Sequence, residues 1–325
     1  MIAFICVLAA SFAFTYWATG RMIPKLKAAK ITGRDMNKPK KPSVPEMGGL
    51  PIVGGFVVGV LLAIALITFS LIDERLNLTY ILAGLSTILI MALIGVIDDL
   101  FIMRQRTKAL LPVLASLPLV AVKAGVTTMT LPFIGPVDFG ILYVLILVPV
   151  AITGASNATN MLAGFNGLEA GLGLVMTGTI GLISYLTGGF EAAILSSAMF
   201  GSLLAFIKYN WYPARILIGD IGTLSIGASV AAIVILGNIE KVGVILIIPF
   251  FAELYLKARS RFQAESWCDV KKNLLVCPKQ SEVYGLGRLV MYLTGGISER
   301  SLVLTLIACE IVFAIIAFLS IVDVY

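Results

Sequence analysis

The sequence predicts an all-α, polytopic integral membrane protein with about ten transmembrane helices and both termini on the non-cytosolic side. Hydrophobic residues make up 59% of the 325-residue chain, charged residues make up 13%, and the mean hydropathy is +1.02. These values are typical of chains that cross a membrane several times. We expect residues 1–325 to form a single transmembrane domain.

The apolar residues gather in ten runs. A helix that crosses a bilayer needs about 17–25 residues, so each run is a candidate span. The runs occupy residues 2–20, 49–72, 79–97, 109–123, 139–155, 168–188, 191–207, 221–237, 242–256 and 301–322. Basic residues follow the first run and none precede it, so we expect a retained span and not a cleaved signal peptide.

The basic residues predict the orientation. Of the 24 Lys and Arg residues, 21 fall on alternate loops, and only Arg75, Lys123 and Lys241 fall on the others. By the positive-inside rule the rich loops are cytosolic, which requires an even number of spans if both termini face outward. The same loops account for the net charge of +6. Because no basic and aromatic residues are interleaved as in a single-strand binder, we expect no nucleic acid partner.

Polar motifs gather in the loops on this cytosolic side, near residues 21–48, 98–108, 156–168, 208–220 and 257–300. The most informative is NATNMLAGFNGLE at 157–169, which follows an apolar helix. Unpaired polar groups in hydrocarbon cost several kcal/mol each, so these side chains need a partner. Amides can ligate a hard cation or hydrogen-bond a base. The chain has no His, the usual zinc ligand and general base.

Three carboxylates are candidates for catalysis or metal binding. Asp98 and Asp99 close a span, where a divalent cation or a basic partner would offset their repulsion; a solvated helix end is the alternative. Asp220 stands between two glycines, as a metal ligand or as the N-cap of the next span.

Three basic residues are candidates for phosphate binding. Lys108 enters the fourth run and is either a phosphate ligand or a lysine that extends to the interface. Arg259 and Arg261 alternate in Arg-Ser-Arg, a spacing that suits a diphosphate or an ordinary topogenic cluster.

Six segments carry a resemblance to a known family. They are RDMNKPKKPSVPE (34–46), IDDLF (97–101), KALLPVLASLPL (108–119), NATNMLAGFNGLEAG (157–171), NWYPARILIGD (210–220) and ISER (297–300). With them the chain resembles the polyprenyl-phosphate N-acetylhexosamine-1-phosphate transferases (glycosyltransferase family 4). The resemblance is greatest to the eukaryotic-type branch that acts on UDP-GlcNAc and dolichyl phosphate at the start of protein N-glycosylation. The absence of His disfavours the bacterial phospho-MurNAc-pentapeptide branch of the family, which has a histidine-rich ninth loop. The short ninth loop predicts a compact prokaryotic relative, from an archaeon.

The resemblance implies a role for individual residues. It implies that Asp220 and Asn160 are the Mg²⁺ ligands, with Mn²⁺ as a substitute ion, and that Lys108 holds phosphate. It implies that UDP-GlcNAc is bound with its uridine in a pocket lined by Arg34, Asp35, Met36, Glu46 and Asn166. It implies that Arg259 and Arg261 hold the diphosphate and the acetamido group of the sugar. It implies that the lipid phosphate lies beside Lys108, Thr153, Asn157, Asn160 and Met161. Asp98 and Asp99 would take a proton from the acceptor or position the metal shell.

The implied reaction transfers GlcNAc-1-phosphate from UDP-GlcNAc to a polyprenyl or dolichyl-type phosphate and releases UMP. The implied location is the membrane, the cell membrane in a prokaryote, with the active site facing the cytosol and lipids around the chain. The alternatives are a transferase for another UDP-HexNAc and a secondary transporter or flippase; the absence of repeat halves disfavours the last two. Monomer and homodimer both stay open.

Overall fold

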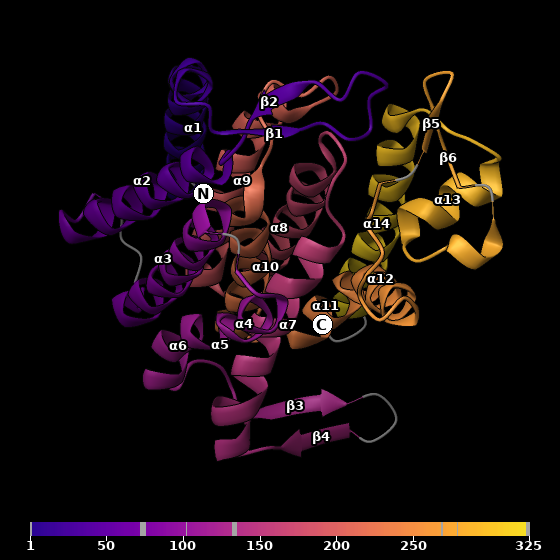
Figure 1. Ribbon diagram of the computed structural model, residues 1–325. Helices are drawn as coiled ribbons and strands as arrows, with labels where there is room; N and C mark the ends of the chain where they lie inside the picture. The colour runs from indigo at the N-terminus through magenta and orange to yellow at the C-terminus, as the bar shows by residue number, and fades with distance from the viewer. Residues whose placement is uncertain are drawn as a thin grey trace.

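Long helices dominate the chain in the computed structural model, which describes residues 2–71, 76–101, 103–131, 135–267, 269–277 and 279–322 (Figure 1). The longer helices are α1 (Ile2–Ala28), α2 (Gly49–Thr68), α3 (Leu78–Phe101), α7 (Val148–Met161), α8 (Leu168–Leu186), α9 (Phe190–Asn210), α10 (Gly219–Leu236), α12 (Ile248–Arg259) and α14 (Glu299–Val322). The shorter ones are α4 (Gln105–Leu110), α5 (Pro112–Ala115), α6 (Leu117–Ala121), the π-helix η1 (Tyr143–Leu147), α11 (Glu240–Leu246), the 3₁₀-helix η2 (Gln280–Glu282) and α13 (Leu286–Thr294).

Among the described residues, eight helical segments are long and apolar enough to cross a membrane, which confirms a polytopic membrane protein. They are α1, α2, α3, η1 with α7, α8, α9, α10 and α14. The other two predicted spans, 109–123 and 242–256, are divided into shorter helices. Pro112 and Pro118 begin α5 and α6, and Pro249 lies in the first turn of α12. Proline interrupts a helix because it lacks the backbone N–H and clashes with the preceding turn.

Among the described residues, three small antiparallel sheets accompany the helices and were not predicted. They are β1 (Thr32–Arg34) with β2 (Ser43–Pro45), β3 (Thr128–Leu131) with β4 (Gly135–Asp138), and β5 (Asp269–Lys271) with β6 (Leu274–Val276). In the first, Thr32 pairs with Pro45 and Arg34 with Ser43. This pairing folds the first polar loop back on itself at the end of α1.

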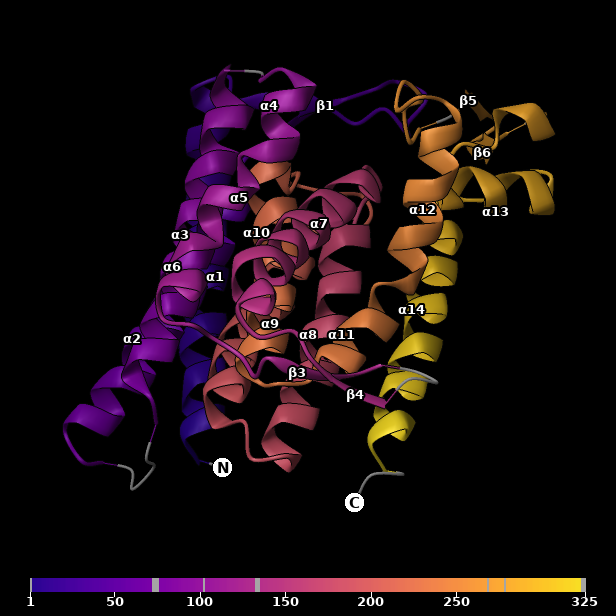
Figure 2. The same cartoon turned by 90° about the horizontal axis from the view of Figure 1, so that it is seen from below.

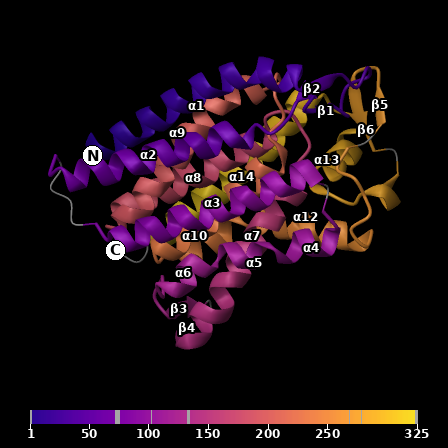
Figure 3. The same ribbon diagram turned by 60° about the vertical axis from the view of Figure 1, so that its left-hand side comes forward.

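The predicted polar loops lie at one end of the bundle. Figure 2 shows α4, β1 and β5 at that end, with β3 and β4 at the other. Figure 3 shows the same end from another side, where α4, α12 and α13 lie toward β1 and β2. The first turn of α1 and the last described turn of α14 lie at the opposite end (Figure 2). The two ends of the described chain therefore lie at the same end of the bundle.

Helix α10 is the most enclosed span, with 89% of its apolar window buried. It packs against α2, α3, α7 and α9. The approach of α3 depends on a residue without a side chain: a Cβ on Gly95 would lie 2.5 Å from Ile221 Cα. Backbones come this close only where one of them carries glycine. The contact places the end of α3 against the start of α10, where the candidate carboxylates lie.

Candidate functional site

A polar cavity of about 490 Å³ opens at the end of the bundle that carries the polar loops. Its wall is formed by the ends of α3, α7, α9 and α12, the starts of α8 and α10, helix α4, strand β1 and the adjoining connecting segments. The cavity brings together most of the predicted site residues: Arg34, Asp35, Met36, Glu46, Asp99, Lys108, Asn160, Met161, Asn166 and Asp220.

Lys108 on α4 lies between two carboxylates. Its Nζ is 2.6 Å from Asp98 Oδ2 and 2.8 Å from Asp220 Oδ2. Burial alone would lower the pKa of the Lys108 ammonium, but the charges and hydrogen bonds of Asp220 and Asp98 outweigh burial and raise its pKa above the usual value. Lys108 is therefore a permanent cation at the cavity wall.

Asp99, the residue after Asp98, does not contact Lys108 but binds the backbone of α10. Its Oδ1 accepts a hydrogen bond from the backbone N–H of Asp220 at 2.8 Å, and its Oδ2 accepts one from Ile221 N–H at 3.4 Å. These N–H groups belong to the first turn of α10, where backbone N–H groups have no carbonyl partner within the helix. Asp99 thus caps α10 from another helix, whereas Asp98 binds Lys108 and the backbone N–H of Met103.

The side-chain amide nitrogen of Asn160, at the end of α7, donates hydrogen bonds to other residues of the protein. Nδ2 donates to a carboxylate oxygen of Asp220 and to Thr223 Oγ1, the latter at 2.9 Å. An ionised carboxylate only accepts, so the nitrogen must face Asp220, and the oxygen of Asn160 is left for another group.

These groups fit a magnesium ion. Mg²⁺ takes one or two carboxylates and completes its shell with water and phosphate oxygens. The carboxylate of Asp220, 29% exposed, and the amide oxygen of Asn160 supply such a partial shell. The described residues contain no group of three or more His, Cys, Asp or Glu side chains arranged for a metal, so the substrate would have to supply the other ligands.

Glu46 follows β2 and lines the same cavity. Burial raises the pKa of its carboxyl, and the negative charge of Asp220 raises the pKa further. A bound cation would relieve this repulsion.

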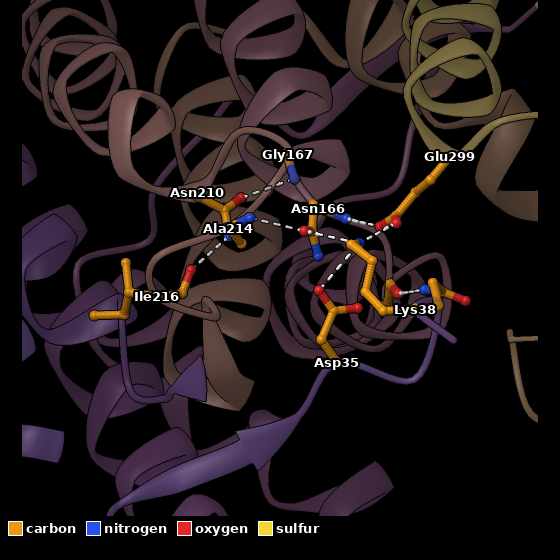
Figure 4. A network of polar contacts seen from close by, with 10 residues as sticks. Asp35, Lys38, Asn166, Gly167, Asn210, Ala214, Ile216 and Glu299 are labelled. Carbon is orange, nitrogen blue, oxygen red and sulfur yellow. Dashed lines mark hydrogen bonds and ion pairs between the residues drawn. The ribbon is translucent and has the colours of Figure 1, made fainter. Parts of the chain in front are cut away.

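Asn166, in the loop between α7 and α8, belongs to a network of polar contacts (Figure 4). Its Oδ1 accepts hydrogen bonds from Lys38 Nζ at 3.2 Å and from the backbone N–H of Ala214 at 2.8 Å. Its own backbone N–H donates to Glu299 Oε1 at 2.8 Å. The network joins the first loop, the loop after α7, the segment after α9 and the start of α14.

A second, apolar cavity of about 390 Å³ lies beside α7, and Met161 lines both this cavity and the first. It extends along α7, α10, α11 and α12 to Tyr143, whose hydroxyl donates to Glu240. Tyr143 and Met161 are 18 positions apart, roughly 27 Å along a helix. Asn157 lines this cavity and donates to the carbonyls of Ala109 at 3.0 Å and Thr153 at 2.9 Å. Thr153 lines neither cavity.

Known proteins resemble the chain along most of its length. Residues 81–238 match the family model described as glycosyl transferase family 4. A Saccharolobus solfataricus protein, provisionally named as a UDP-N-acetylglucosamine–dolichyl-phosphate N-acetylglucosaminephosphotransferase, is 36% identical over 94% of this chain and 93% of its own length. The chain belongs to glycosyl transferase family 4.

Two further relatives are named as two different transferases. A Dictyostelium discoideum protein named UDP-N-acetylglucosamine–dolichyl-phosphate N-acetylglucosaminephosphotransferase is 31% identical over 71% of this chain and 66% of its own length. A Halalkalibacterium halodurans protein named phospho-N-acetylmuramoyl-pentapeptide-transferase is 31% identical over 73% of this chain and 75% of its own length.

Two of the site residues predicted from the family 4 resemblance lie away from the cavity. Arg259 and Arg261 are exposed and do not line it. Lys257 lines it instead, because on α12 residues two apart point to nearly opposite sides. Lys257 Nζ donates to Ser266 Oγ at 2.9 Å and lies 3.7 Å from Glu253 Oε1. The Glu-to-Lys spacing of four residues is the signal in the sequence that could have indicated Lys257.

Two further residues of this site, Glu169 of the 157–169 motif and Lys38, were given no role from the sequence. Glu169 lines the cavity and accepts a hydrogen bond from the backbone N–H of Gly164 at 2.6 Å, which holds the loop after α7. Lys38 had been counted only as one of the basic residues of the first loop. Asp35 lies three positions before Lys38 and is one of its partners, but the other carboxylate, Glu299, is 261 positions away.

Proposed function

We propose that this protein transfers GlcNAc-1-phosphate from UDP-GlcNAc to a dolichyl-type polyprenyl phosphate and releases UMP. The observation that carries the proposal is that Met161 lines both a polar cavity with Lys108, Asn160 and Asp220 and an apolar cavity along α7. A nucleotide sugar fits the first and an isoprenoid chain fits the second. The names of the relatives from Saccharolobus and Dictyostelium support the same pair of substrates.

The reaction joins two polyanions, so neutralising charge is its main requirement. A lipid phosphate oxygen attacks the β-phosphorus of UDP-GlcNAc, the bond from that phosphorus to the bridging oxygen breaks, and UMP leaves with the electron pair. Lys108, held between Asp98 and Asp220, and Lys257 from α12 supply positive charge beside the phosphates. A bound Mg²⁺ would supply further charge neutralisation and orient the diphosphate oxygens. Asn160 and Asp220 would hold it.

Direct attack by the lipid phosphate is supported by the contacts of the two neighbouring aspartates. A phosphate monoester with a second pKa near 6 is already mostly dianionic at pH 7, so it needs little activation. Both oxygens of Asp99 accept hydrogen bonds from α10, and Asp98 binds Lys108 and Met103. Asp98 therefore orients Lys108, and Asp99 orients the start of α10 that carries Asp220.

The active site faces the cytosol in this proposal, because the end of the bundle with the cavity also carries the loops rich in Lys and Arg. Nucleotide sugars reach the enzyme from that side.

The test is product formation by the purified protein in lipid nanodiscs. Dolichyl phosphate is offered with UDP-GlcNAc, UDP-GalNAc or UDP-MurNAc-pentapeptide in separate reactions, and lipid products are identified by mass spectrometry. We expect GlcNAc diphospho-lipid and an equal amount of UMP. A product only from another nucleotide sugar would reassign the substrate, and no lipid product from any of them would reject the proposal.

A further inference from the structure

Helix α13 presents a row of leucines on its outer side. Gly287 and Met291, one turn apart, are buried on the inner side. Leu286, Leu289 and Leu293 follow one another at spacings of three and four residues, which places them together on the opposite face. Leu293 is 72% exposed, and the other two leucines are half-buried. An apolar row of this kind marks a face that another apolar surface covers.

The length of α14 places α13 at the surface of the bilayer. The part of α14 that can cross the membrane, Glu299–Ile321, has 23 residues. At 1.5 Å per residue it spans about 34 Å, more than the hydrocarbon thickness of about 30 Å, so its first turn lies among the lipid head groups. Residues 295–298 alone separate α13 from α14, and Gly295 and Gly296, both with positive φ, turn the chain there. Helix α13 therefore lies at the level of the head groups.

The described part of the protein packs against the inner side of α13. Figure 2 shows α13 crosswise to α14 and outside the bundle, with β5 and β6 farther toward the end that carries the polar loops. The helix packs on β6, α12 and α14. On the inner side a Cβ on Gly287 would lie 3.1 Å from the ring of Phe165. The leucine face lies on the opposite side of the helix, where the bilayer surface is.

Exposed basic residues accompany this face. Arg300 is in the first turn of α14, and Lys271 and Lys272 stand where β5 turns into β6. Anionic phospholipid head groups attract Lys and Arg side chains near the membrane surface. An apolar face flanked by cations is the pattern of helices that lie in the plane of the interface. Anionic lipid is the partner that fits both features, and α14 already brings it to this place.

Helix α13 is joined to the wall of the polar cavity through Glu253 on α12. The carboxylate of Glu253, 2% exposed, accepts a hydrogen bond at 2.5 Å from the backbone N–H of Leu286, in the first turn of α13. Its Oε1 also lies 3.7 Å from Nζ of Lys257, which lines the cavity. Because the start of α13 and the lysine share one carboxylate, a shift of the helix changes the position of the lysine.

Arg288 of α13 fastens a second part of the same wall. Its guanidinium donates to the carbonyls of Glu265 at 3.0 Å, Trp267 at 3.0 Å and Glu282 at 3.2 Å. Residues 263–267 line the cavity and form no helix or strand of their own. Their course therefore depends on side chains from neighbouring elements, and Arg288 binds two of their carbonyls.

We propose that the leucine face of α13 lies on the anionic phospholipid surface of the bilayer that α14 crosses, and that this contact holds Lys257 and residues 263–267 in the wall of the polar cavity. Anionic phospholipid is then an activator of the protein, apart from the lipid acceptor. The docking of α13 goes beyond the proposed function, whereas the activation rests on it, because activation is measured through KM for UDP-GlcNAc.

The lipid contact is tested with a fluorophore on Leu293→Cys, in a variant without the native cysteines, reconstituted in nanodiscs of phosphatidylcholine and phosphatidylglycerol. Spin-labelled phospholipid in the same discs quenches a fluorophore that lies at the interface. We expect strong quenching at position 293 and weak quenching at Lys40→Cys, an exposed position of the first loop. Equal quenching at the two positions would overturn the docking, and a partner protein or a second copy of the chain would then cover the leucines.

The effect on the cavity is tested by transfer kinetics in discs with and without phosphatidylglycerol, at one mole fraction of acceptor. We expect KM for UDP-GlcNAc in the wild type to be at least about threefold lower with phosphatidylglycerol, a fraction of what the burial of one leucine can contribute. Leu293→Asp places a negative charge against the head groups and should lose this difference, whereas Leu293→Phe stays apolar and should keep it. Gln280→Asp adds the same charge to η2, outside α13, and should also keep it.

Hydrogen exchange gives a readout that needs no transfer. The amides of residues 263–267 should exchange at least about threefold more slowly with phosphatidylglycerol in the wild type, and should not respond to it in Leu293→Asp. Quenching at position 293 together with a KM and an exchange rate that do not respond to phosphatidylglycerol would overturn the coupling. A wild type that makes no lipid product would reject the proposed function, while quenching and exchange still decide the inference.

Discussion

Asp99, at the end of α3, binds the backbone N–H of Asp220, at the start of α10, with a distance of 2.8 Å from Oδ1 to the nitrogen. Gly219 precedes Asp220 with φ at +71°, and a Cβ there would lie 2.6 Å from Asp99 Oδ2. One carboxylate thus fixes the helix end from which the other carboxylate enters the cavity. The two aspartates have separate tasks although both line the same space.

Asp220→Asn should reduce turnover by at least about a hundredfold, the scale of losing a key electrostatic stabiliser, while the protein still folds. The asparagine keeps an oxygen for Asn160 but loses the charge that pairs with Lys108 and would hold a cation. Turnover is measured with Mg²⁺ and in excess EDTA, which should abolish it in the wild type. Asp138→Asn, an exposed carboxylate of β4, is the matched control. Full activity in EDTA would reject the metal.

Lys257→Ala should raise KM for UDP-GlcNAc by about tenfold or more, because it removes a partly buried cation from the cavity wall and a hydrogen bond to a charged group is worth about 1.5–3 kcal/mol. Arg259→Ala and Arg261→Ala serve as controls and should change KM by less than about twofold, since both side chains are exposed outside the cavity. Steady-state kinetics of the three variants measures KM for UDP-GlcNAc and shows which of the three basic residues binds it. A larger effect of either arginine would restore the original assignment of the diphosphate ligands.

Gly95→Ala should lower the free energy of unfolding by about 1–3 kcal/mol, the usual effect of overpacking. The new methyl group would push α3 from α10, and the Asp99 carboxylate would move away from the N–H of Asp220. The melting temperature in detergent and the turnover number should therefore both fall. Gly154→Ala, where a Cβ has nothing within 4 Å, is the stability control. An unchanged melting temperature in Gly95→Ala would contradict the close contact.

Cysteines placed at Lys40 and Lys271, in a variant without the native cysteines, should react with membrane-impermeant maleimide only from the cytosolic side. Both residues are exposed and lie in basic loops. A cysteine at Lys123, in the segment between α6 and β3, should react from outside. Labelling of position 40 or 271 in sealed cells would invert the orientation.

The protein with UDP-GlcNAc alone should release no UMP, because both oxygens of Asp99 are hydrogen-bonded and neither neighbouring aspartate is free to attack phosphorus. Rapid quench experiments without lipid measure this directly. One equivalent of UMP, with sugar phosphate trapped on an aspartate, would establish a covalent intermediate instead.

Much of this site could be predicted from the sequence, because its residues lie in short motifs at the ends of apolar runs. Asp98, Asp99, Asn160 and Asp220 were all found in that way. The subdivision of the fourth and ninth spans could have been read from Pro112, Pro118 and Pro249. The inward turn of Lys38 could not, since it depends on the carboxylate of Glu299, which only the folded chain brings near.

The apolar cavity along α7 has exposed side chains at its margin, among them Val150, Val244 and Phe251. Such a margin lets a long isoprenoid chain enter the cavity laterally from the surrounding lipid without leaving the bilayer. The rate of the reaction then depends on the mole fraction of the acceptor among the membrane lipids, and not on its concentration in the whole sample. Diluting the vesicles should leave the rate per protein unchanged, while adding inert phospholipid to the same vesicles should slow it.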